Sequence, residues 1–213
     1  MEKKETMGNK KNDPMVWIDC EMTGLEVGVD ELIEVAVIVT DAELRPLDAG
    51  IDLLIKPSAA ALAHMNDFVR DMHTKSGLLA QLDGGLPVDE AARQVLDYVK
   101  RFVPEAGKAH LAGNSVHSDK AFLAAQMPEL IAWLHYRIID VSTLKELAMR
   151  WYPKVYGLAP EKTGNHRALG DIQDSINELR FYRAALMPAG EGPSGDELKA
   201  LAASVTATSP FAG

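Results

Sequence analysis

Three apolar stretches rich in β-branched residues lie close together near the start of the chain. They occupy residues 16–20 (VWIDC), 31–41 (ELIEVAVIVTD) and 50–57 (GIDLLIKP). Valine and isoleucine favour strands, and Pro57 ends the third stretch because proline cannot donate to a strand ladder. The connections between the stretches are short. We therefore predict three antiparallel strands, arranged as a meander or a pair of hairpins.

From residue 59 the pattern becomes helical, and short strands then alternate with helices. Residues 88–103 place apolar side chains three and four positions apart, as in an amphipathic helix. Further helices are predicted over residues 119–127, 142–152 and 167–186, and short strands over 110–115 and 137–140. Thr143 and Glu146 fit a capping box. This order predicts an α/β fold with a mixed β-sheet, in which three antiparallel strands are followed by shorter parallel strands and helices flank the sheet.

The 213 residues are predicted to form one folded domain. Apolar residues make up 47% of the chain, which is enough to bury a sizeable core. Residues 1–14 are polar and predict a disordered extension, and residues 15–187 form the domain. Residues 188–213 are predicted to be a flexible tail with a short helix capped by Ser194.

The charge balance restricts the kind of partner. Asp and Glu outnumber Lys and Arg by 31 to 22, which gives a net charge of −9. Binding of long double-stranded nucleic acid usually needs a basic surface, so such a partner is not expected. A short substrate held by local groups and a metal remains compatible with this charge.

Cysteine content and hydropathy indicate the compartment. The single cysteine, Cys20, allows no intramolecular disulfide and no cysteine-based zinc site. The chain has no apolar run near 18 residues and no signal-like segment. We therefore expect no membrane association and a cytoplasmic protein.

Acidic side chains recur at positions where strands end or helices begin. Asp19 and Glu21 are two residues apart in the first strand, so their side chains share a face. Asp119 begins one predicted helix, and His166 and Asp171 lie at the start of another. Singly, these residues have ordinary interpretations, such as an exposed edge acid, a helix-dipole partner or a capping histidine. Together they occupy the places where α/β folds build their sites.

Four carboxylates in one site would repel each other unless a cation neutralised them. Oxygen ligands without cysteine favour Mg²⁺ or Mn²⁺ over zinc. Two such ions about 4 Å apart can clamp the attacking and leaving oxygens of a phosphoryl displacement. A histidine nearby titrates near neutral pH and can accept a proton from the attacking water.

The ordered set of D-x-E, a distant D and H-x4-D resembles the DEDDh superfamily of 3′–5′ exonucleases. Within it the chain resembles the oligoribonucleases over about residues 16–183, in motifs that are much more specific than the acids alone. These are WIDCEMTGL, AGNSVHSD, MPEL, LHYRIIDVSTLKELAMRWYP and NHRALGDIQDSINELRFYR.

The resemblance implies an RNase H-like sheet and a catalytic centre. Such enzymes remove 5′-mononucleotides one at a time from the 3′ end of very short single-stranded RNA of about two to five nucleotides, notably dinucleotides. By this resemblance Asp19, Glu21, Asp119 and Asp171 hold two Mg²⁺ or Mn²⁺ ions, and His166 is the general base.

The same resemblance implies a set of substrate-binding residues. Leu25 is expected to wedge against a base and Phe68 to stack on one, where many members carry tryptophan. His73 matches a histidine near the substrate. The 5′ phosphate is expected to be gripped by a further set: Ser115, Arg137, Ser142 and Thr143. Guanidinium groups and helix N-termini both suit phosphate.

Tyr136 matches a tyrosine that in the family reaches into the neighbouring subunit's site, so the resemblance implies a homodimer. Two other functions remain open. One is a DEDDh exonuclease acting on DNA ends or tRNA tails, against which the phosphate-gripping motifs argue. The other is a non-catalytic RNA-binding scaffold, against which the presence of all four acids and His166 argues.

Overall fold

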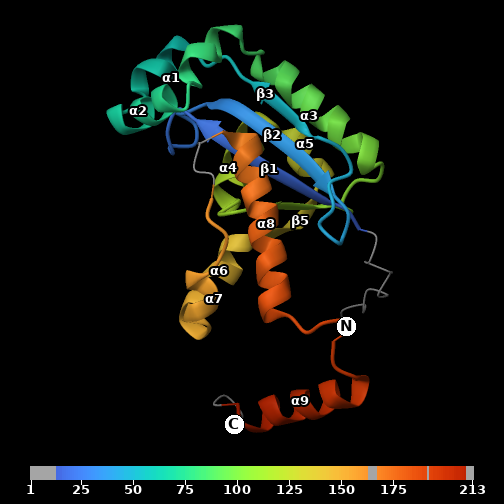
Figure 1. The fold of residues 1–213 in the computed structure, drawn as a ribbon. Coiled ribbons are helices and arrows are strands. Elements are labelled where there is room, and N and C mark those ends of the chain that lie inside the picture. The colour runs from blue at the N-terminus through green and yellow to red at the C-terminus, as the bar shows by residue number, and fades with distance from the viewer. Residues whose placement is uncertain (1–12, 163–166, 191, 210–213) are drawn as a thin grey trace.

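The computed structural model describes residues 13–162, 167–190 and 192–209. Within these ranges five strands form one sheet in the order β3–β2–β1–β4–β5 (Figure 1). The strands are β1 Met15–Met22, β2 Leu32–Thr40, β3 Ile51–Leu54, β4 His110–Gly113 and β5 His135–Asp140. The pairs β1–β2 and β2–β3 are antiparallel, and the pairs β1–β4 and β4–β5 are parallel. The predicted mixed sheet is confirmed.

Helices cover both faces of this sheet. Figure 1 shows α8 crossing one face, with α3 and α5 on the other. The α-helices are α1 Ala59–His64, α2 Asp67–Lys75, α3 Val88–Phe102, α4 His117–Gln126, α5 Pro128–Trp133, α6 Val141–Trp151, α7 Pro153–Gly157, α8 Ala168–Leu186 and α9 Gly195–Ala207, and a 3₁₀ helix spans Leu79–Gly84. Within the described ranges, no helix has the length and apolar character needed to cross a membrane.

The alternation of side chains along β1 decides which face carries the acids. Val16, Ile18 and Cys20 belong to one core cluster, on the side of α3, α4 and α5. Trp17 belongs to the other cluster, which includes side chains of α6 and α8. Residues two apart share a face, so Asp19 and Glu21 follow Trp17 and face α8.

The neighbouring strand leaves the end of β1 open. β4 pairs with β1 only at Met15, Val16 and Trp17. Beyond that point the same edge of β1 is met by the start of α4, because β4 has already turned into the helix. The sheet therefore has a gap beside the part of β1 that carries the acids.

The predicted capping box at Thr143 and Glu146 is wrong. α6 begins at Val141, and its cap is Asp140, whose side chain accepts a hydrogen bond from the Ser142 N–H. Asp140 is also the last residue of β5, so strand and helix join without a loop and the acid at the junction becomes the cap.

The predicted helix in the tail is present as α9. Ser194 caps it and forms a capping box with Glu197. The helix is exposed throughout and lies apart from the sheet in Figure 1. The division of the chain at residues 14 and 187 stays a prediction.

Candidate active site

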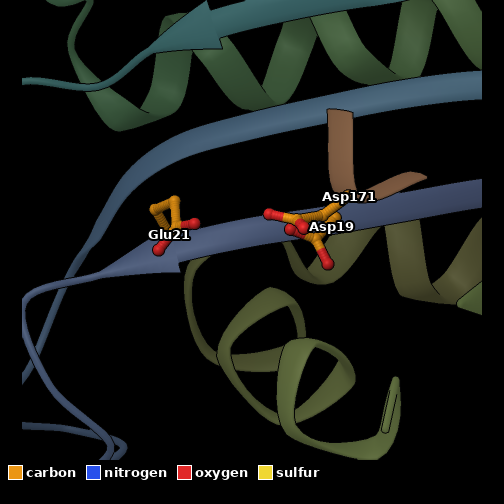
Figure 2. A group of neighbouring side chains, drawn as sticks. All are labelled: Asp19, Glu21 and Asp171. Carbon is orange, nitrogen blue, oxygen red and sulfur yellow. The ribbon is translucent and has the colours of Figure 1, made fainter. Parts of the chain in front are cut away.

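Three carboxylates meet above the sheet. Asp19 and Glu21 come from β1 and Asp171 from the first turn of α8, and one oxygen of each lies within 4.8 Å of the others (Figure 2). Side chains 152 positions apart in the sequence are thus brought together because β1 turns its acids toward α8. This cluster could hold a divalent cation through oxygen ligands alone.

Asp119 lies beside this group, in the first turn of α4. Its Oδ1 accepts a hydrogen bond of 3.0 Å from the Cys20 N–H, on the edge of β1 that β4 leaves open. Asp119 lines the same cavity of about 550 Å³ as the three clustered acids. The four predicted acids therefore share one open cavity at the end of β1.

Burial and mutual repulsion raise the pKa values of these acids. Burial raises the pKa of Asp19 to about 9, with further contributions from Asp119, Asp171 and Glu21. Burial, followed by the charge of Glu34, raises the pKa of Glu21 to about 8. Burial also raises the pKa of Asp119 to about 7. At neutral pH such a site retains protons unless a cation replaces them, so the donor set fits a bound divalent ion.

An ion pair between Glu34 and Arg167 lies next to the clustered acids. Glu34 on β2 is the cross-strand neighbour of Glu21, and its side chain is fully buried. The Arg167 guanidinium lies 2.7 Å from Glu34 Oε1, and Glu34 Oε2 accepts a hydrogen bond of 3.1 Å from the Ala168 N–H. Two like charges opposite each other on a sheet are destabilising. Arg167 offsets this repulsion, and its positive charge limits the rise in the pKa of Glu21.

Ser115 and Ser142 lie together at the rim of the cavity. The Ser115 N–H donates to Ser142 Oγ at 2.8 Å and to Asp140 Oδ1 at 2.9 Å, and the two hydroxyl oxygens are 3.1 Å apart. Ser115 has a φ of 51°, an uncommon backbone conformation for a residue with a side chain. These contacts bring residues of the β4–α4 turn and of α6 to one point.

The other residues predicted to grip phosphate are not part of this contact. Arg137 is exposed on β5, and its guanidinium lies 5.2 Å from the centre of the Tyr136 ring. Tyr136 is 71% exposed and stacks on His135. Thr143 is exposed in the first turn of α6. In this single chain, the pair of serines and the pair formed by Tyr136 and Arg137 are separate features.

The residues predicted to contact bases differ in their exposure. Leu25 is 83% exposed and lines the cavity, and Phe68 on α2 is 79% exposed. His73, also on α2, is fully buried. Its Nε2–H donates to the Met22 carbonyl at 2.9 Å, and its Nδ1 lies 3.9 Å from Glu21 Oε2. His73 is therefore buried directly behind Glu21, one of the acids that line the cavity.

His166, the predicted general base, lies outside the described residues. Its place in the chain, between Lys162 and Asp171, is bounded on both sides by residues that line the cavity.

Sequence reasoning missed several residues around the site. Glu34 carried a signal, because it is an acid inside a nine-residue strand that is buried throughout. Lys145 also carried one, because it follows Ser142 by three residues on the same helix. Glu178 and Asn114 gave no signal, since their role depends on contacts between distant segments.

The fold and the acidic site are those of a class of nucleases. Residues 16–179 match the family model described as Exonuclease. An oligoribonuclease from Cutibacterium acnes is 56% identical over 189 residues, which cover 89% of this chain and 94% of that protein. An oligoribonuclease from Streptomyces coelicolor is 57% identical over 192 residues, covering 90% and 96%. The chain therefore belongs to the oligoribonuclease family.

Solved structures support the fold independently. A complex of E. coli exonuclease I with single-stranded DNA, in a zinc-bound form, aligns with a TM-score of 0.64 at 14% identity over 82% of this chain. Exonuclease I from Methylocaldum szegediense aligns with a TM-score of 0.58 at 16% identity. This chain spans about two fifths of the length of those proteins, at 41% in both cases. The shared part confirms the predicted RNase H-like fold.

Proposed function

We propose that the protein is a 3′–5′ exoribonuclease that degrades very short single-stranded RNA, notably dinucleotides, to 5′-mononucleotides. The observation that carries this proposal is the convergence of Asp19, Glu21 and Asp171 within 4.8 Å, with Asp119 beside them, in a chain whose relatives are oligoribonucleases. The cavity is open and single-stranded RNA is a flexible ligand that fits such a site. We place the protein in the cytoplasm.

The four carboxylates are proposed to hold two Mg²⁺ or Mn²⁺ ions. When bound, the ions supply charge stabilisation at the scissile phosphate and lower the pKa of an attacking water. Asp19 and Glu21 are fixed by the β1–β2 ladder, and Asp171 by the start of α8. Asp119 is held by the Cys20 N–H. His166 is proposed to take the proton from the water.

Substrate length is proposed to be set by capture of the 5′ phosphate. Ser115 and Ser142 present two hydroxyls side by side, and Arg137 and Thr143 complete the predicted set. Leu25 and Phe68 are proposed to contact the bases, and His73 is proposed to lie near the substrate, behind Glu21. Capture of a terminal phosphate favours short chains. Because a net charge of −9 gives no long-range attraction to RNA, such local contacts would supply the affinity.

A homodimer is proposed to complete the site. Tyr136 is exposed on β5, an edge strand of the sheet, where a second copy can meet it. Exposed aromatic side chains also gather on α6 and in the turn before α7, at Trp151 and Tyr152. Tyr136→Ala is expected to lower activity more than it lowers metal binding. An active monomer by light scattering, indifferent to this change, would remove the dimer from the proposal.

The test of the function is a substrate panel. The purified protein is incubated with a 5′-phosphorylated RNA dinucleotide, a ten-nucleotide RNA and a matching DNA, with Mg²⁺ or with EDTA. We expect the dinucleotide to be cleaved fastest, and only with Mg²⁺. Preference for DNA would favour the other DEDDh activities, and full activity in excess EDTA would contradict the metal mechanism.

Asp171→Asn provides the matched loss of function. It removes one ligand charge and keeps the size of the side chain, so cleavage should fall by at least about a hundredfold. Asp89→Asn is the control, because Asp89 is also an acid in the first turn of a helix, α3, and lies away from the cavity. The control should retain wild-type rates.

A further inference from the structure

The cavity has an acidic floor and a basic wall. Asp19, Glu21 and Asp171 form the floor, and Lys145 from α6 and Lys162 from the segment after α7 line the wall. Among the described residues that line this cavity, these two are the lysine or arginine side chains; Glu146, which also lines it, is paired with Arg150. The proposed function uses the floor and leaves the wall without a role.

One buried carboxylate holds both lysines. Glu178 on α8 is only 4% exposed. Lys145 Nζ lies 3.6 Å from its Oε1, and Lys162 Nζ lies 3.9 Å from its Oε2. A buried carboxylate needs a charged partner, and one lysine would satisfy that need. Two lysines carry more positive charge than this one carboxylate needs, on side chains that are 38% and 39% exposed, and Lys162 also interacts electrostatically with Asp19.

The same carboxylate is connected to the serine pair. Asn114 Nδ2–H donates to Glu178 Oε2 at 3.0 Å, and Asn114 Oδ1 accepts from the Ser142 hydroxyl at 3.1 Å. Ser142 in turn accepts from the Ser115 N–H. Lys145 follows Ser142 by three positions on α6, so both side chains lie on one face of that helix. Lys145 is thus connected to the Ser142 hydroxyl through Glu178 and Asn114 and lies on the same face of α6.

We propose that Lys145, held by Glu178, is a further substrate-binding residue that binds the 5′ phosphate of a short oligonucleotide together with Ser142. Lys162 adds a second positive charge on the same wall. An ammonium group attracts phosphate as a point charge. The Ser142 hydroxyl orients the phosphate once its single proton turns from Asn114 Oδ1 to a phosphate oxygen. The inference rests on the proposed function, since it assigns the basic wall to the same substrate.

The test compares two dinucleotides that differ only in a 5′ phosphate or a 5′ hydroxyl. Lys145→Met should lower kcat/KM for the phosphorylated dinucleotide by about ten- to a hundredfold, the range for a lost charged contact. It should change the 5′-hydroxyl dinucleotide little. Lys162→Met should act in the same direction and more weakly. Lys145→Arg keeps the charge and should retain most of the phosphate preference.

Lys108→Met is the matched control. Lys108 is an exposed lysine paired with Glu105 near the start of β4, at the opposite end of that strand from Asn114. It loses the same charge, so any effect of net charge alone would appear in it. We expect wild-type behaviour with both dinucleotides.

Binding of both dinucleotides is also measured, by equilibrium titration in Ca²⁺. The inference predicts that Lys145→Met weakens binding of the phosphorylated dinucleotide selectively. Equal losses on both dinucleotides, or no loss on either, would overturn it. A wild-type protein that binds the dinucleotides with this preference and does not cleave them would contradict the proposed function and leave the phosphate subsite supported.

Discussion

Glu34→Gln offers the sharpest test of how the sheet supports the metal site. In the wild type the fully buried Glu34 carboxylate contacts the Arg167 guanidinium at 2.7 and 2.8 Å, and the Ala168 N–H at 3.1 Å. The substitution keeps the shape of the side chain and removes its charge. Arg167 then faces a neutral amide that can accept at only one of the two oxygen positions.

The expected cost follows from the burial of the two partners. Breaking a buried ion pair by removing one charge typically costs about 3–5 kcal/mol. Arg167 is 28% exposed, so it can regain some contact with water, and we expect a value near the lower limit, about 3 kcal/mol. For a protein of this size that corresponds to a fall in Tm of roughly 6–12 °C.

A functional loss should accompany the loss of stability. The Glu34 contacts fix the first residues of α8, and Asp171 follows Arg167 by four positions. Loss of a partner outside the ligands commonly weakens metal binding about ten- to a hundredfold. The Mg²⁺ concentration for half-maximal cleavage should therefore rise by at least roughly tenfold in Glu34→Gln.

The assays are urea unfolding in EDTA and a Mg²⁺ titration of the cleavage rate. Glu43→Gln is the control, because Glu43 forms an exposed ion pair with Arg45, for which a cost of at most about 1 kcal/mol is expected. If Glu34→Gln unfolds at the same urea concentration as this control, the buried pair does not support the site and the reasoning fails.

Three further outcomes follow from the site. The pKa of Asp19 is raised from an ordinary 3.8 to about 9, so the stability that protonated Asp19 contributes is complete below about pH 4 and is lost as pH rises toward 9. The Tm measured in EDTA should therefore fall from pH 6 to pH 9, and Asp19→Asn should reduce that fall. Arg137→Ala should slow dinucleotide cleavage by about ten- to a hundredfold, and a ten-nucleotide RNA less, with Arg137→Lys recovering only part; equal losses would show that Arg137 serves general binding. His73→Leu should cost about 1–3 kcal/mol in urea unfolding, because the buried Met22 carbonyl loses its donor; an unchanged unfolding midpoint would contradict this.

The three antiparallel N-terminal strands could be predicted because they depend on local pattern. The three N-terminal strands are apolar and closely spaced, and period-two alternation was enough to put Asp19 and Glu21 on one face. The capping box at Thr143 failed for a local reason as well. Asp140 ends a strand and caps the next helix, and sequence spacing alone cannot distinguish between two candidate caps three residues apart.

The contact between Glu34 and Arg167 could not be predicted, because it depends on which face of β2 packs against α8. Glu34 stands out as an acid inside an apolar strand, but its partner Arg167 is more than a hundred residues away, and no local pattern connects the two. Once β2 pairs with β1 in the observed register, however, Glu34 must lie opposite Glu21. Two buried acids in that arrangement require a cation, and Arg167 at the start of α8 supplies it. The contact between Glu34 and Arg167 therefore neutralises a buried acid of the sheet and also fixes the start of α8, the helix that carries Asp171. Folding of the sheet and assembly of the proposed metal site depend on this same contact.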